Sequence, residues 1–231
     1  MIELVKSSVV FSEENHTYFL GEKQLKGITG MISRQLFPNK YKDIPEYILK
    51  RAAEKGSRIH GQCQFADVTG LPPESIEAIN YIRERLNAGY KAFANEYTVS
   101  DNEYFASNID CVWEKDEKIS LVDIKTTASL DREYLSWQLS IYAYLFELQN
   151  PLIKVDKLFG IWLRGDKSEL VEIERKPDAE VKRLLECEIN GEHFLPNAPV
   201  PTDGKQLIPM QLVDTIIDIE EQASYIAEVQ K

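Results

Sequence analysis

Two aspartates and a lysine are the residues of this chain best suited to chemistry. Asp123 and Lys125 flank Ile124 in the β-prone run LVDIKTT. Because side chains alternate between the faces of a strand, Asp123 and Lys125 are expected on one face and Ile124 on the other. Asp110 lies upstream in the run NIDCVW. If the segment EKDEK forms a hairpin turn centred on its Asp-Glu pair, Asp110 faces Asp123 on the neighbouring strand.

Two carboxylates in this position would repel each other unless a cation lay between them, because facing Cβ atoms stand about 5 Å apart. Mg²⁺ and Mn²⁺ prefer oxygen ligands and retain several waters, which leaves room for a phosphate oxygen and an attacking hydroxide. Lys125 would orient or deprotonate the water and stabilise the additional negative charge. The pattern therefore predicts metal-dependent hydrolysis of a phosphodiester.

Four further side chains are candidates for the same site. His60 lies in a stretch of helical periodicity, and Glu96 stands at the head of the first β-rich run, as a further ligand through water or for a second metal. Gln138 and Tyr142 are spaced to share one helix face, from which they could reach a phosphate or a base. Each candidate also has a structural alternative, namely a solvated acid, a packed histidine or a polar residue at a helix interface.

The elements that would position these residues follow from hydrophobic periodicity. Helical spacing covers residues 45–66, 73–90 and 132–148, β-rich runs fill 96–125, and another buried strand is expected near 157–163. The expected fold is α/β: a mixed sheet of about four or five strands flanked by helices. We expect a single domain with an N-terminal hairpin in 1–30, a catalytic core in 45–176 and a helical extension in 177–231 that ends in an amphipathic helix from Pro209.

Taken in order, these segments resemble the RecB-like branch of the PD-(D/E)xK nuclease superfamily, whose core is restriction-endonuclease-like. That branch combines a helical Gly-x-x-x-His, an Asp on one strand, an (Asp/Glu)-x-Lys on the next strand and a Gln-x-x-x-Tyr on the following helix. The matching residues here are Gly56 and His60, Asp110, Asp123 and Lys125, and Gln138 and Tyr142. The N-terminal pattern VVFSEENHTYFL is also similar to the leading hairpin of phage-encoded, phage-type exonuclease members.

The resemblance covers roughly residues 50–165 and implies a ligand set for Mg²⁺ or Mn²⁺. The implied ligands are His60, Asp110, Asp123 and the backbone carbonyl of Ile124. The chain departs from the family at Ser107, where members commonly carry Gly, and its three cysteines fall short of the four that iron–sulfur members need. No iron–sulfur cluster is therefore expected.

Charge, hydropathy and cysteine content limit the possible partners and location of the protein. The net charge of -11 argues against indiscriminate nucleic-acid binding, although a local basic groove is compatible with it. No apolar run is long enough to span a bilayer, the first residues do not resemble a signal peptide, and Cys63, Cys111 and Cys187 are expected as reduced thiols. We expect a cytoplasmic protein without membrane contacts.

The resemblance implies a DNA exonuclease of phage or bacterial recombination or repair. Expected partners are DNA, further copies of the chain in a homo-oligomer, and a recombination partner protein. Three alternatives remain open at this point: a structure-specific endonuclease, a DNA-binding or assembly subunit without turnover, and a metal-free globular protein with an acidic face.

Overall fold

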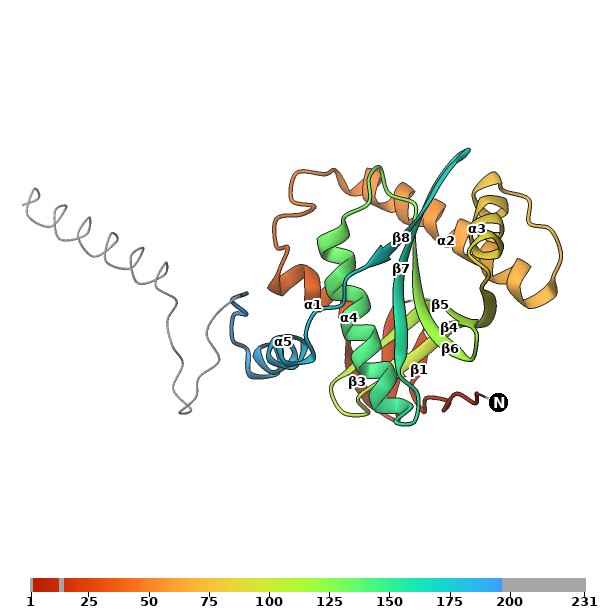
Figure 1. Cartoon of the computed structure of the whole chain (residues 1–231). Helices are drawn as coiled ribbons and strands as arrows, with labels where there is room; N and C mark the ends of the chain where they lie inside the picture. The colour runs from red at the N-terminus through yellow and green to blue at the C-terminus, as the bar shows by residue number, and fades with distance from the viewer. Residues whose placement is uncertain (1, 13–14, 197–231) are drawn as a thin grey trace, which may run out of the picture. The chain divides into compact units, whose positions relative to one another are not determined.

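The computed structural model describes residues 2–12 and 15–196 (Figure 1). The chain divides into two compact units, Met1–Glu192 and His193–Lys231. The amphipathic helix expected from Pro209 lies outside the described residues. Within the described part of the chain, no helix is both long enough and apolar enough to cross a membrane.

One mixed eight-stranded sheet forms the centre of the first unit, which confirms the predicted α/β class, although the sheet has more strands than the four or five expected, because the N-terminal strands join it. Its strands are β1 (Val10–Ser12), β2 (Thr17–Leu20), β3 (Lys23–Gly27), β4 (Lys91–Ser100), β5 (Phe105–Lys115), β6 (Lys118–Lys125), β7 (Val155–Arg164) and β8 (Lys167–Ile173). The spatial order is β1-β2-β3-β5-β6-β7-β8, with β4 paired to β5. Strands β3 and β5, and likewise β6 and β7, run parallel, whereas the other neighbours are antiparallel.

Helices cover both faces of this sheet (Figure 1). They are α1 (Ile28–Gln35), α2 (Glu46–Thr69), α3 (Ile76–Asn87), α4 (Arg132–Gln149) and α5 (Asp178–Asn190). Helices α2 and α3 bury Ile59, Cys63 and Tyr81 against β5, β6 and β7, in a core that includes Trp113 and Ile124. Helix α4 connects β6 to the parallel strand β7 and packs on the other side.

Gly160 of β7 shows which face of the sheet α4 covers. A Cβ atom added to Gly160 would collide with the side chain of Leu135 of α4, so the present packing of Leu135 needs glycine at this position. Gly160 is paired with Asp123 of β6. Paired residues share a face, so Asp123 lies on the side covered by α4, and Ile124 lies in the core below α2 and α3.

The hairpin between β5 and β6 has the register that the sequence predicts. Asp116 and Glu117 both have left-handed backbones, with φ of 53° and 60°, as a two-residue turn between twisted strands requires. The ladder runs from Lys115 paired with Lys118 to Cys111 paired with Val122. The next step along both strands brings Asp110 and Asp123 to the end of this ladder.

Strands β4 to β8 make up the core of the sheet, and the β1–β3 meander extends it. The meander agrees with the predicted N-terminal hairpin. Strand β8 and helix α1 were not identified in the sequence. Edge strand β8 (KSELVEI) holds only a few apolar residues, and the helical spacing of Ile28, Met31 and Ile32 in α1 extends over only eight residues, so both signals are short.

Candidate metal centre

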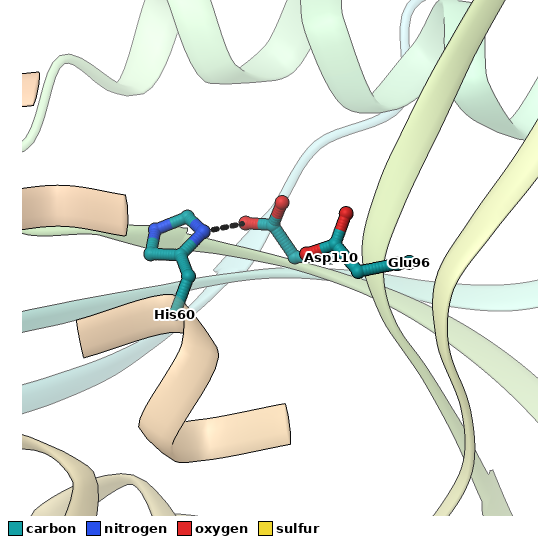
Figure 2. Close-up of side chains that lie close together, drawn as sticks. All are labelled: His60, Glu96 and Asp110. Carbon is teal, nitrogen blue, oxygen red and sulfur yellow. Dashed lines mark ion pairs between the residues drawn. The ribbon is translucent and has the colours of Figure 1, made fainter. Parts of the chain in front are cut away.

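Three ligand-bearing side chains from three different elements meet at one point. His60 of α2, Glu96 of β4 and Asp110 of β5 each offer a ligand atom, and these atoms all lie within 4.8 Å of one another. All three residues are partly buried. Figure 2 shows His60 pointing from its helix toward Asp110, with the Glu96 carboxylate beside Asp110. This group could hold a metal ion.

Asp110 lies at a fork in the sheet, which is the gap between two ladders on the same edge of β5. On one edge of β5, Phe105 and Ala106 pair with β3, whereas Cys111–Lys115 pair with β6. Between these two ladders the Asp110 carboxylate takes over the role of a strand partner, because its Oδ2 accepts the backbone N–H of Ile124 at 2.7 Å. The same oxygen lies 3.5 Å from His60 Nδ1. The fork thus fixes the carboxylate at the edge of the sheet and directs it toward α2.

Glu96 reaches the group from an unusual backbone conformation. Its φ of 47° lies in the left-handed region, which glutamate adopts rarely. On either side of it Asn95 pairs with Cys111 and Tyr97 pairs with Ile109, so Glu96 stands beside Asp110 across the β4–β5 ladder. Sequence reasoning had Glu96 only as an additional ligand, since a left-handed residue inside a strand leaves no pattern in the sequence.

Asp123 lies next to this group, and its carboxylate is bound by other residues. The residue is only 2% exposed. Its Oδ2 forms an ion pair with Lys125 Nζ at 2.6 Å, and its Oδ1 accepts a hydrogen bond from Gln138 Nε2 at 2.8 Å. It is not part of the group of ligand atoms within 4.8 Å. Its role as a ligand, like that of the Ile124 carbonyl, stays a prediction.

Burial and charge act in opposite directions on this pair. Burial raises the pKa of Asp123 to about 6, against the attraction of Lys125 and together with the repulsion of Asp110. Burial alone would lower the pKa of Lys125, but Asp123 and Asp110 outweigh it and the pKa lies above its ordinary value. Lys125 is therefore a cation held next to two acids.

Gln138 and Tyr142 of α4 extend the pair into a buried hydrogen-bonded network. Gln138 Oε1 accepts from Lys125 Nζ at 3.1 Å, and Gln138 Nε2 also donates to the Tyr142 hydroxyl at 2.8 Å. Ser107 Oγ lies 3.0 Å from the same hydroxyl. Ser107, which appeared in the sequence only as a departure from the family pattern, is thus buried and bound to the site.

Helix α2 lies close to the end of β6 at Gly56. A Cβ atom on Gly56 would stand 3.4 Å from Thr126 Oγ1, just after Lys125. The helix continues through Gly56 without interruption and ends at Gly70, which has a left-handed φ of 70°. This close approach of α2 to β6 lies one turn before His60, whose imidazole reaches Asp110.

No family model and no curated protein matches this chain. Among solved structures that match it is one described as the crystal structure of SSO0001, with 18% sequence identity and a TM-score of 0.44. The match covers 78% of this chain and 80% of that chain. Similarity at this level carries no argument about function.

Proposed function

We propose that this protein is a metal-dependent DNA nuclease of the PD-(D/E)xK type, acting as an exonuclease in phage or bacterial recombination or repair. One observation carries the proposal: the group of His60, Glu96 and Asp110 lies directly beside the ion pair of Asp123 and Lys125. A bound metal could activate a water for phosphodiester hydrolysis, and a neighbouring cation could stabilise the additional negative charge. The exonuclease assignment rests on the sequence resemblance.

The donor set fits a divalent cation of the Mg²⁺ or Mn²⁺ type. Two carboxylates provide hard oxygen ligands and reduce their own repulsion when a cation lies between them. The imidazole of His60 suits Mn²⁺ better than Mg²⁺, which rarely takes nitrogen ligands. When bound, the cation would act as a Lewis acid and lower the pKa of a coordinated water.

Lys125 would bind the substrate through its charge. Its ammonium is held between Asp123 Oδ2 and Gln138 Oε1 and still has a quarter of its side chain exposed. That leaves a donor for a non-bridging phosphate oxygen, where negative charge accumulates during hydrolysis. Asp123 and Gln138 fix the direction of the ammonium, so that little reorganisation is needed when the substrate arrives.

Charge also makes substrate binding dependent on metal. Without a cation, Glu96, Asp110 and Asp123 present acidic groups to an incoming phosphate, and the Lys125 ammonium offsets part of that charge. The overall charge of -11 adds to the repulsion. We therefore expect DNA to bind at this centre only when the metal is present.

The proposal is tested by digestion of end-labelled linear DNA, single- and double-stranded, alongside a closed circular plasmid, with Mn²⁺ or Mg²⁺. We expect linear DNA to be degraded from its ends while the circle stays intact. Cleavage of the circle would indicate an endonuclease. Intact linear DNA with both metals, despite measurable Mn²⁺ binding, would favour a DNA-binding subunit without turnover.

The matched variant for this assay is Lys125→Ala. It leaves His60, Glu96 and Asp110 in place, so Mn²⁺ affinity measured by calorimetry should stay within about threefold of wild type, while the rate of cleavage should fall at least about a hundredfold. Cleavage at the wild-type rate would remove Lys125 from the mechanism.

A further inference from the structure

A second polar cluster lies on the side of the sheet covered by α2 and α3. Its centre is Asp67 of α2, whose side chain has no exposed surface. Asp67 Oδ2 accepts hydrogen bonds from the Tyr81 hydroxyl at 2.6 Å and from Asn95 Nδ2 at 2.9 Å. Its Oδ1 pairs with Arg85 NH2 at 3.0 Å. One buried carboxylate thus joins α2, α3 and β4.

Two residues of this cluster are sequence neighbours of ligands of the proposed metal centre. Asn95 immediately precedes Glu96, and its register partner Cys111 immediately follows Asp110. Cys111 Sγ is tied to the same cluster, at 3.2 Å from the Tyr81 hydroxyl and 3.7 Å from Asn95 Nδ2. Asp67 itself lies about two helical turns beyond His60 on α2, on a similar side of the helix.

We propose that Asp67 is a positioning residue that sets the relative positions of the metal ligands, acting through Asn95 on Glu96. The inference rests on the metal centre of the proposed function. Its physical basis is the left-handed backbone of Glu96, with φ of 47°. Such a conformation in a non-glycine residue persists only where the surroundings hold it in place. The hydrogen bond from Asn95 to Asp67 is the side-chain anchor immediately before that residue.

The same contacts fix the distance between the helix and the strands. The carboxylate of Asp67 receives donors from residues on two other elements, and a buried carboxylate tolerates loss of a donor poorly. These contacts therefore hold α2 at a fixed distance from β4 and β5. That distance sets the separation of His60 from Glu96 and Asp110.

Asn95→Ala tests the inference, because it removes the anchor without touching a ligand. We expect Mn²⁺ affinity, measured by calorimetry on folded protein, to fall about tenfold, as happens when groups behind metal ligands are removed. Asp67→Asn should lower the affinity less, since its amide oxygen can still accept a hydrogen bond from Asn95.

A matched control separates positioning from stability alone. Glu188 of α5 is another buried carboxylate, and its side-chain donors Lys26, Arg34 and Gln35 include none of the ligands. Glu188→Gln should lower the melting temperature and leave Mn²⁺ affinity unchanged. Wild-type Mn²⁺ affinity in Asn95→Ala would overturn the inference.

A second measurement needs no metal, so it also serves if the wild type binds none and the proposed function fails. Crystal structures of metal-free wild type and Asn95→Ala should differ at Glu96, whose backbone is expected to leave the left-handed region in the variant. If Glu96 keeps its conformation and its place beside Asp110 in Asn95→Ala, the inference is overturned.

Discussion

The backbone N–H of Ile124 donates to Asp110 Oδ2 at 2.7 Å, so an acidic side chain completes the hydrogen bonding at the end of the β5–β6 ladder. This contact gives Asp110 two roles. Its negative charge adjoins His60 and Glu96, and its oxygen satisfies a backbone donor of the residue between Asp123 and Lys125. The two roles can be separated by substitution.

Asp110→Asn keeps a side-chain oxygen for Ile124 and removes the charge. Its metal-free stability should stay within about 1 kcal/mol of wild type, while Mn²⁺ should no longer raise its melting temperature. Asp110→Ala should lose both the hydrogen bond to Ile124 and the rise in melting temperature with Mn²⁺. The unpaired N–H should cost about 1–3 kcal/mol of stability. Thermal unfolding with and without Mn²⁺ measures both effects. An unchanged Mn²⁺ shift in Asp110→Asn would exclude Asp110 as a ligand.

The raised pKa of Asp123, about 6, predicts a pH dependence of the metal-free protein. Because the folded state holds this proton more tightly than the unfolded state, Asp123 favours folding at low pH, and that contribution is lost as the pH rises from about 4 to 6. Its size is on the order of 3 kcal/mol. Urea unfolding across this range should show the decrease in wild type relative to Asp123→Asn. Parallel pH profiles for the two proteins would contradict it.

His60→Ala should distinguish the two candidate metals. Loss of an imidazole ligand should weaken Mn²⁺ binding by about tenfold or more and Mg²⁺ binding by less, because imidazole suits the softer ion. Calorimetric titration with each metal provides the comparison. His16→Ala is the control, since His16 is exposed and contacts the Phe11 ring. Equal losses for both metals would argue against direct ligation.

Ser107 and Tyr142 should be energetically coupled through their hydroxyl contact of 3.0 Å. In a double-mutant cycle of Ser107→Ala and Tyr142→Phe, the unfolding free energies should be non-additive by about 0.5–3 kcal/mol. The control is a second cycle, of Ser120→Ala with Tyr142→Phe, which should be additive. Ser120 is also buried, but within the described residues its Oγ has no hydrogen-bond partner. Strict additivity would show that the contact contributes nothing.

The hairpin register could be predicted from the sequence because one local signal fixes it. The Asp116–Glu117 turn lies between two runs of β-rich residues, and a turn of known length determines which residues face each other. The point at which the strands part could not be predicted. It depends on the Asp110 carboxylate replacing a backbone partner, which is a tertiary arrangement.

The outer parts of the site could not be predicted from the sequence either. The left-handed conformation of Glu96 and the anchor from Asn95 to Asp67 depend on contacts between residues far apart in sequence. The motif identified Gln138 and Tyr142, yet Ser107 gained a role only once its neighbours in space were known. Spacing in a sequence can thus indicate chemistry on single elements, whereas distances between elements require the fold.

Gly160 links the packing of α4 to the network around Asp123. Asp123 is its register partner, and Gln138, which binds Asp123, lies one turn beyond Leu135 on the helix that Gly160 admits. A methyl group at this position would collide with Leu135 Cδ2, so the Leu135 side chain or α4 itself would have to shift. The packing beneath α4 and the hydrogen bond from Gln138 to Asp123 therefore depend on neighbouring parts of one helix, although Gly160 carries no functional group.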